Sequence, residues 1–408
     1  MTSLQKRLEE QSSKKKAALL IFIIILLLTL FLIFIEVGSF FFLKIVSGKE
    51  KVKINQEEII SLPFKGAEDS AIVRKTRNGE TNCPPNRLIY NKDSESPEWE
   101  IKDVTCNGAE NIKSGFRVTT GQPENTEHQV HVFGGSTIWG SGSSDAFTIP
   151  SLIQRFINER GLDWRVQNYG FITFTSHQQL ERLKRTQIAR GDLVIFYDGG
   201  NDIWHGVVYG RPKGTIFGYN DENRIGIYIN RLKFYLNTKS HFYRVLGWIK
   251  NRSQIVILCK SIAKKEIEER TRIAFEVYKA NIVAAKIIVE SKGGYFFHFF
   301  QPTVISRKPN SPHEINLIQN LSDDAHCGLI HMQQATEYYR RHYREIDPKI
   351  NATDLSQLLQ PGRSGKEYFF DWIHISSIGN KEVSASIFLT ILPLLTGEGI
   401  SDHFSLRH

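Results

Sequence analysis

Residues 129–137 read QVHVFGGST, a short apolar run that ends on two glycines followed by two hydroxyl side chains. A run of this length that is rich in valine and phenylalanine favours a β-strand. Gly134 and Gly135 allow the backbone to bend sharply after it, because glycine has no Cβ. Ser136 is therefore expected where a strand turns toward a helix, with its hydroxyl group at the edge of a sheet.

Three further apolar runs follow the same pattern. Residues 164–168, 192–197 and 295–300 read WRVQN, DLVIFY and YFFHFF, and each is followed within a few residues by glycine or proline. Their length and composition favour strands. Helices are expected from Thr148 to Gly161 and over residues 176–190, 261–292, 328–344 and 377–395, with a loop over residues 303–328. Because strands that alternate with helices form parallel sheets, the sequence predicts an α/β fold with helices on both faces of the sheet.

Four short segments contain the residues that could perform chemistry. They are GGST at 134–137, NYG at 168–170, GGND at 199–202 and DWIH at 371–374. The first three come directly after predicted strands, so parallel strands would bring them to one edge of the sheet. Each segment taken alone also fits an ordinary turn, and their interpretation as one site depends on all four occurring together.

Ser136, His374 and Asp371 are the candidate catalytic residues. A serine hydroxyl is a poor nucleophile unless a base accepts its proton and a third group orients that base. His374 is the candidate base, and Asp371, three residues earlier, is close enough along the chain to hold its imidazole. For a histidine among 13, a surface or structural role is the alternative.

Negative charge on a carbonyl oxygen requires hydrogen-bond donors, and losing one such donor costs about 3 kcal/mol of transition-state stabilisation. The candidate oxyanion donors are the backbone N–H groups of Ser136 and Gly170 and the side-chain amide of Asn201. Gly170 would let the backbone approach a substrate closely, and Asn201 follows two glycines after a fully apolar strand. A turn residue is the alternative interpretation of Asn201.

In this order the four segments resemble the SGNH branch of the GDSL esterase/lipase superfamily, which carries its Ser, Gly, Asn and His in four blocks. The resemblance covers residues 129–395 and implies a three-layer flavodoxin-like sandwich with a central parallel sheet, and it implies neither a cofactor nor a metal ion. It makes Ser136 the nucleophile, His374 and Asp371 the base and its orienter, and Gly170 and Asn201 oxyanion donors. Gly135 replaces the aspartate of the family's Gly-Asp-Ser motif.

The N-terminal region predicts attachment to a membrane. Residues 17–35 contain no charged side chain, and such a stretch is long enough to cross a bilayer. A cleaved signal peptide is the alternative. The lysines at 14–16 favour a cytoplasmic tail over residues 1–16 and a catalytic domain outside the cytoplasm, periplasmic or on the cell surface. Lys44 and the lysines near it weaken this bias.

The remaining domain predictions concern polar regions. Residues 46–125 are expected to form an irregular extension with short strands, and residues 126–400 the hydrolase-like domain. An insertion is predicted at about 206–250, either a lid or a solvated helical hairpin. Cys83 and Cys106 are predicted to form a disulfide, whereas Cys259 and Cys327 are either a second pair or ordinary thiols.

Composition narrows the class of function. The excess of 52 basic over 43 acidic residues gives a net charge of +9, which is modest for 408 residues and does not indicate a nucleic-acid partner. The leading hypothesis is a membrane-anchored serine esterase that removes acyl groups, such as acetyl, from an envelope glycan or a lipid-type substrate. The alternatives are an O-acyltransferase that uses the same residues and a non-catalytic envelope scaffold.

Overall fold

The computed structural model describes residues 26–27, 29–42, 88–90, 99–101, 103, 105, 110–213, 264–306, 312–346, 350–359 and 367–397. The chain divides into two units, residues 1–62 with 217–257 and residues 63–216 with 258–408. The predicted tail at 1–16, most of the 46–125 extension and the larger part of the 206–250 insertion lie outside the described residues. So do Cys83, Cys106, Cys259 and the side chain of Cys327, so the disulfide stays a prediction.

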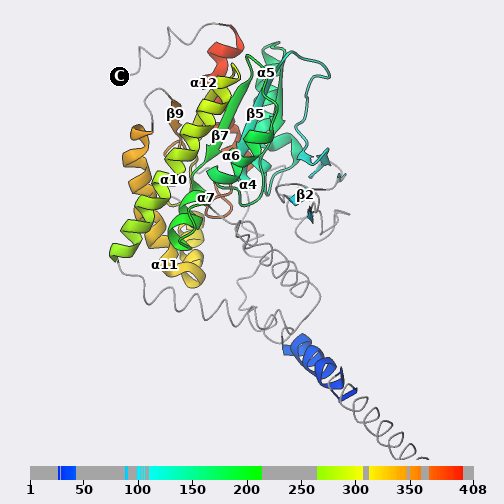
Figure 1. Cartoon of the computed structure of the whole chain (residues 1–408), viewed down its shortest axis with the longest axis vertical. Coiled ribbons are helices and arrows are strands. Elements are labelled where there is room, and N and C mark those ends of the chain that lie inside the picture. Colours follow the sequence, from blue (N-terminus) through cyan, green and yellow to red (C-terminus); the bar gives the residue numbers. More distant parts are fainter. Residues whose placement is uncertain are drawn as a thin grey trace, which may run out of the picture. The chain divides into compact units, whose positions relative to one another are not determined.

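The second unit contains a five-stranded sheet in which every pair of neighbours is parallel (Figure 1). The spatial order is β6 (Trp164–Asn168), β5 (His128–Gly134), β7 (Leu193–Asp198), β8 (Tyr295–Phe300) and β9 (Asn351–Asp354). Counted along the chain this is the order 2-1-3-4-5, the flavodoxin-like arrangement. The predicted α/β fold with a central parallel sheet is confirmed.

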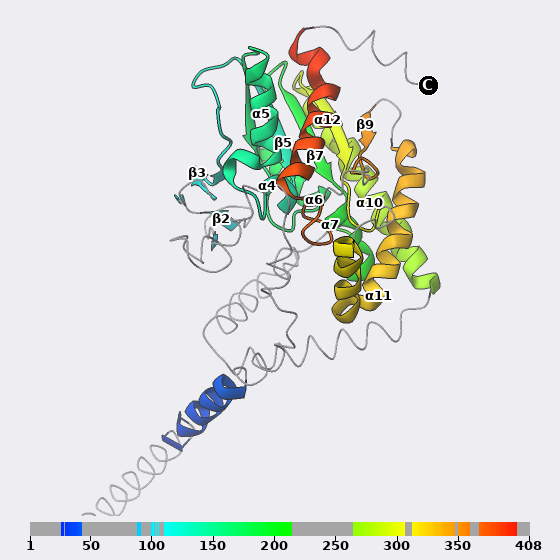
Figure 2. The same cartoon turned by 180° about the vertical axis from the view of Figure 1, so that it is seen from behind.

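Helices cover both faces of this sheet (Figures 1 and 2). The chain moves one way from β5 to β6 and the other way from β6 to β7, and right-handed crossovers then put the two connecting helices on opposite faces. The helices on one face are α5 (Ile149–Glu159) and α12 (Ser377–Leu395), and those on the other are α6 (Ser176–Arg185) and α10 (Lys264–Ser291), with α11 (Pro312–His342) beside α10.

The remaining elements are short. Two antiparallel pairs precede the sheet, and single turns interrupt the loops. These elements are β1 (Leu88–Tyr90), β2 (Trp99–Ile101), β3 (Ile112–Lys113), β4 (Phe116–Arg117), α4 (Ser136–Trp139), η1 (Asp145–Phe147), α7 (Gly200–Ile203), the π-helical turn η2 (Trp204–Val208) and η4 (Tyr343–Glu345).

The core explains why the strands are so apolar. All six residues of β7 are buried, as expected for a central strand covered on both faces. The predicted start of α5 is also correct, because the Thr148 hydroxyl accepts a hydrogen bond from the N–H of Ser151 at 3.3 Å, and proline lies in the first turn.

Two predictions of secondary structure are wrong, and one strand was missed. Residues 303–328 are not all loop, because α11 already begins at Pro312, a residue well suited to a first helical turn. The polar stretch 320–324 has low helix propensity, and the helix continues through it. The helix predicted over 176–190 ends at Arg185, and the edge strand β9, which reads NATD, was not predicted from its weakly apolar sequence.

One helix among the described residues, α12, is long and apolar enough to cross a membrane by length and composition. Val383, Ile387 and Ile391 on this helix are nevertheless fully buried, and α12 packs along α5. These contacts make α12 a core helix of the α/β unit. In the predicted anchor, the described helical residues include the shorter apolar segment Thr29–Phe42.

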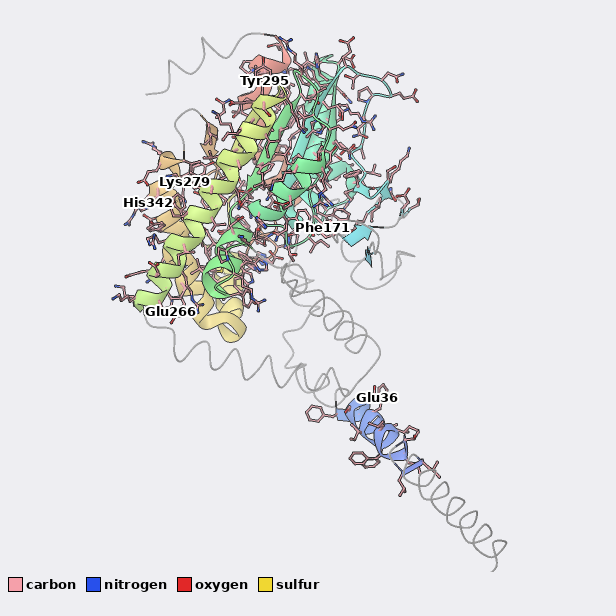
Figure 3. All side chains as sticks on the ribbon, viewed as in Figure 1. Glu36, Phe171, Glu266, Lys279, Tyr295 and His342 are labelled. Carbon is pink, nitrogen blue, oxygen red and sulfur yellow. The ribbon has the colours of Figure 1, made fainter. Side chains whose placement is uncertain are left out.

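The carboxyl ends of the strands define one edge of the sheet. Figure 3 shows Phe171, which follows β6, at one end of the sheet, and Tyr295, the first residue of β8, toward the other. Parallel register aligns Val132 of β5 with Asn168 of β6 and Gly134 with Tyr197 of β7. The direction of strand succession reverses at β5, and ligands of such sheets bind at the carboxyl edge beside this switch point.

Candidate active site

Ser136 lies at the switch point, as the first residue of the single turn α4. A methyl group at position 134, two residues before the serine, would lie 2.3 Å from Cγ1 of Ile138 and 2.7 Å from the carbonyl oxygen of Tyr197. Only glycine therefore fits where β5 ends. The serine is 7% exposed. Because the first N–H groups of a helix have no intrahelical acceptor, the Ser136 N–H is available to a ligand.

His374 contacts Ser136 across 238 residues of chain, and Asp371 contacts the other side of the His374 ring. Nε2 of His374 lies 2.7 Å from Oγ of Ser136, and Nδ1 lies 2.6 Å from Oδ2 of Asp371. A charged carboxylate only accepts hydrogen bonds, so Nδ1 must donate, and Nε2 is then free to accept the serine proton. The structure thus brings together the three residues for which the sequence predicts a catalytic role.

Asp371 is set up to remain charged. Burial by itself would raise its pKa, but hydrogen bonds from the His374 ring and from the backbone N–H groups of His374 and Ile373 outweigh it, so the pKa is lower than usual. The N–H distances to Oδ1 are 2.7 Å for His374 and 2.9 Å for Ile373. A charged partner at Nδ1 stabilises the imidazolium that forms when Nε2 accepts a proton.

A short hairpin holds the base in place. Phe369 and Ile375 form an antiparallel bridge on either side of the DWIH turn, and the N–H of Phe370 donates to the carbonyl oxygen of His374 at 3.2 Å. The Phe370 ring lies nearly parallel to the His374 ring, with centroids 5.7 Å apart and an interplanar angle of 9°. The imidazole is therefore restrained by both the backbone and a stacked ring.

Asn201 lies in α7, the short turn that follows β7, and its amide packs beside the backbone at Gly135. Its Nδ2 donates to the carbonyl oxygen of Phe174 at 2.9 Å, which uses one of the two amide hydrogens. A methyl group at Gly135 would lie 2.5 Å from this nitrogen, so the amide rests directly against the backbone that precedes Ser136. This position is suited to donating the second hydrogen to an oxyanion at Ser136.

Gly170 packs closely against α4, and its N–H has a hydrogen-bond partner within the protein. Its N–H donates to Oδ1 of Asn168 at 2.8 Å, and the same asparagine donates from Nδ2 to the carbonyl oxygen of Ile138 at 2.9 Å. A methyl group at position 170 would lie 2.4 Å from the backbone nitrogen of Trp139. Gly170 is thus closely packed and its N–H has a partner in Asn168, and its predicted role as an oxyanion donor stays a prediction.

The conformation of Thr173 was not predicted from the sequence. The residue has φ = 67° in an exposed turn, closed by the N–H of Phe174 donating to the carbonyl oxygen of Phe171 at 3.3 Å. Glycine or asparagine normally occupies such a position, and a β-branched residue there is strained. Because the next carbonyl, that of Phe174, holds Asn201, the strained turn borders the site.

An aromatic pair beside the site was also missed. Trp204 belongs to η2, and its ring lies 5.4 Å from the ring of Trp372, the residue that follows Asp371. Both indoles are half-buried, and Tyr209 next to Trp204 is 47% exposed. π-Helical turns are rare and occur often at functional sites. No sequence pattern distinguishes this turn from an ordinary helix end.

Among the described residues, no group of three or more His, Cys, Asp or Glu side chains could hold a metal ion. The arrangement instead combines a hydroxyl, a base, a charged orienting group and two donors near the hydroxyl. These are the parts required for acyl transfer through a covalent intermediate.

Comparisons with known proteins find similarity in structure and not in sequence. No protein-family model matches the chain, and no curated protein matches it. A member of the lipolytic protein G-D-S-L family from Veillonella parvula DSM 2008 is 11% identical, with 66% of this chain and 98% of that chain covered and a TM-score of 0.36. An inhibitor-bound aryl esterase from M. smegmatis is 12% identical, with 65% and 99% covered and a TM-score of 0.36.

A third solved structure is a catalytic mutant of an acetylxylan esterase from Geobacillus stearothermophilus. It is 11% identical, with 65% of this chain and 95% of that chain covered and a TM-score of 0.36. These three solved structures are thus a lipolytic G-D-S-L protein and two esterases.

Proposed function

We propose that this chain is a serine-dependent ester hydrolase with Ser136 as nucleophile. The observation that supports this most strongly is the continuous contact from Asp371 through His374 to Ser136, at 2.6 and 2.7 Å. Bringing three partly buried polar groups into one hydrogen-bonded chain costs free energy, which favours a functional role for this arrangement. Asp371 is charged and Nε2 of His374 carries no proton, so the imidazole can accept the proton of the Ser136 hydroxyl.

The reaction would proceed in two halves. Oγ of Ser136 attacks the ester carbonyl while Nε2 of His374 takes its proton, and the Ser136 N–H and the Asn201 amide bind the oxyanion. The carbonyl reforms as the alcohol leaves with the proton from the imidazolium. Water then attacks the acyl-enzyme with His374 again as base, releasing the acid and restoring the serine.

The substrate class follows from the surroundings of the base. We propose an acylated glycan, with acetyl as the acyl group, because Trp372 of the DWIH segment packs against Trp204, which in turn contacts Tyr209, and these rings offer aromatic faces. Aromatic rings bury apolar surface while their polar atoms stay hydrated, which suits the C–H face of a sugar ring. A lipid-type substrate is the alternative within the same mechanism.

Membrane attachment is part of the proposal. Large apolar side chains in the described helical residues of the predicted anchor are exposed, among them Leu32 at 65% and Phe34 at 75%. Exposed apolar surface of this extent is stable in lipid rather than in water. Residues 17–35 would thus anchor the protein, with the catalytic domain outside the cytoplasm acting on envelope material.

Labelling with a fluorophosphonate probe tests the nucleophile. The wild-type chain should be labelled, and Ser136→Ala should not be. Ser141→Ala is a matched control. Ser141 lies five residues further on, just after α4, and its replacement should leave labelling unchanged. A wild-type chain that resists the probe would favour the scaffold alternative.

Product analysis with acetylated glycans then separates hydrolysis from transfer. Ester hydrolysis releases one acetate for every acetyl group lost from the glycan. Acetate appearing on an added acceptor sugar, in place of free acetate, would identify the O-acyltransferase alternative, in which a sugar hydroxyl replaces water in the second half of the reaction.

A further inference from the structure

Two further carboxylates, those of Asp198 and Asp202, lie buried close to Asn201 along the chain. Asp198 ends β7 and Asp202 lies in α7, and each residue is only 2% exposed. Within the described part of the chain, no lysine or arginine forms an ion pair with either carboxylate, and Oδ2 of each has no hydrogen-bond partner. For Asp202, which lacks even the histidine that Asp198 contacts, the charged form is unstable in this buried position.

The surroundings of Asp202 are otherwise polar but uncharged at neutral pH. Burial, the largest cause, raises the pKa of Tyr278, Tyr339 and Tyr343 well above the usual value, so these phenols carry no charge. His298 lies on the side of Asp198, with its Nε2 2.9 Å from Oδ1. The titratable groups that face the pair are His298 of β8, Tyr278 of α10, Tyr339 of α11 and Tyr343 of η4.

Asp202 also holds the segment that positions the oxyanion donor. Its Oδ1 accepts the N–H of Ser176 at 2.9 Å and the hydroxyl of Ser176 at 2.6 Å, and Asn281 donates to that hydroxyl oxygen at 3.0 Å. Ser176 is two residues after Phe174, whose carbonyl oxygen accepts from Asn201. The adjacent side chains Asn201 and Asp202 therefore fix two points of one short segment.

We propose that Asp202 is a positioning residue that holds Asn201 in the oxyanion site, and that it does so as a neutral carboxylic acid. Loss of its proton would put a second negative charge beside Asp198 in a buried space. An ionised carboxylate accepts hydrogen bonds more strongly, but repulsion from Asp198 would displace it from Ser176, so the 174–176 segment would shift and the Asn201 amide would lose its aim at the oxyanion. This inference rests on the proposed esterase function.

The acid form is consistent with the electrostatics. Burial and then the charge of Asp198 raise the pKa of Asp202 to about 8, against the opposing effect of the hydrogen bonds from Ser176. The carboxyl group is therefore protonated at neutral pH and loses its proton in mild alkali. Catalysis should fall as the pH rises through this value.

The first test compares kcat against pH for wild type, Asp202→Asn and Asp202→Ala. Asparagine keeps an acceptor oxygen for Ser176 and cannot ionise, so it should retain kcat within about threefold at pH 7 and lack the alkaline decline. Alanine removes the acceptor and should lower kcat at pH 7 by at least ~10-fold with little change in KM, because an oxyanion donor acts on the transition state. Asn281→Ala loosens the same contacts without titrating and should keep the alkaline decline at its wild-type pH.

The second test reads the proton without activity, so that failure of the esterase proposal can be told apart. Between the unfolded pKa of 3.8 and the folded pKa of about 8, the folded chain holds a proton that the unfolded chain has lost. Wild-type stability should therefore fall with rising pH relative to Asp202→Asn, and the Tm difference should level off above the folded value.

Two results would overturn the inference. One is an Asp202→Asn chain as inactive at pH 7 as Asp202→Ala, since a charged carboxylate would then be required. The other is a Tm difference between wild type and Asp202→Asn that does not change with pH. Labelling of Ser136 with normal pH-dependent Tm but no turnover would instead count against the esterase proposal alone.

Discussion

Gly135→Ala offers the sharpest test of the oxyanion site, because it moves one atom group without touching the triad. The new methyl group would lie 2.5 Å from Nδ2 of Asn201 and 3.2 Å from the carbonyl oxygen of Phe174. Carbon and nitrogen atoms pack at about 3.5 Å or more, so the amide must retreat by about 1 Å. The backbone at position 135, with φ = −81° and ψ = −153°, accepts alanine without strain.

The expected effect is on rate and not on folding. A displacement of about 1 Å in a catalytic group can cost ~10²-fold, so kcat should fall by about that factor while KM changes little. Stability should fall by only ~1 kcal/mol, because the moving group is the end of a side chain that loses one hydrogen bond to Phe174. Gly170→Ala is the contrasting control, because its methyl group would strike the Trp139 backbone and should destabilise the whole unit.

Steady-state kinetics on a double-mutant cycle checks the reasoning. Once Asn201 is alanine, the methyl group at position 135 has no amide to displace, so Gly135→Ala/Asn201→Ala should be no slower than Asn201→Ala alone. Asn201→Ala itself should reduce kcat by ~10²–10³. Fully additive losses, or a Gly135→Ala enzyme with wild-type kcat, would refute the placement of the amide.

The remaining predictions concern the relay, the strained turn and the topology. Ser136→Ala and His374→Ala should each remove nearly all hydrolysis, by up to ~10⁶ in kcat, and purified Ser136→Ala with more than about a tenth of the wild-type rate would exclude the mechanism. Asp371→Asn should lower kcat by ~10³–10⁴, because its amide favours the wrong tautomer of His374; an unchanged pH–rate profile and rate would mean that Asp371 only shapes the turn. Thr173→Asn should raise the free energy of unfolding by ~1 kcal/mol, because asparagine tolerates positive φ, and denaturant titration measures it; a loss would show that the hydroxyl makes the turn. Reporter fusions after residue 60 should be active only outside the cytoplasm, and activity inside would reverse the topology.

The strands that form the site could be predicted because their burial is written into their composition. β7 is apolar up to its last residue, Asp198, since both of its faces are covered, and glycines follow it where the chain must turn. The short edge strand β9 has one neighbour and a weakly apolar sequence, so the pairing with β8 determines it and local propensity does not. The length of α11 escaped prediction for a similar reason, since tertiary context overrode its polar middle.

The site was predictable at the level of residues but not of hydrogen bonds. Order along the chain pointed to Ser136 and His374, although their contact spans 238 residues. The sequence indicated Gly170 as a donor, but it could not reveal the hydrogen bond that this N–H makes to Asn168. The burial of Asp202 and the positive φ of Thr173 depend on three-dimensional packing, which no local pattern encodes.

The position of the DWIH hairpin has a consequence for biosynthesis. The nucleophile and all five strands come before residue 371 in the chain, whereas the base and its orienter come after them. A ribosome that has delivered β9 has therefore made a chain with a complete sheet and a serine that nothing activates. Since domains tend to fold from the N-terminus as they emerge, competence is acquired when the hairpin and α12 dock, as the last event of assembly. In the proposed membrane-anchored esterase, a nascent chain would therefore remain inactive until that moment.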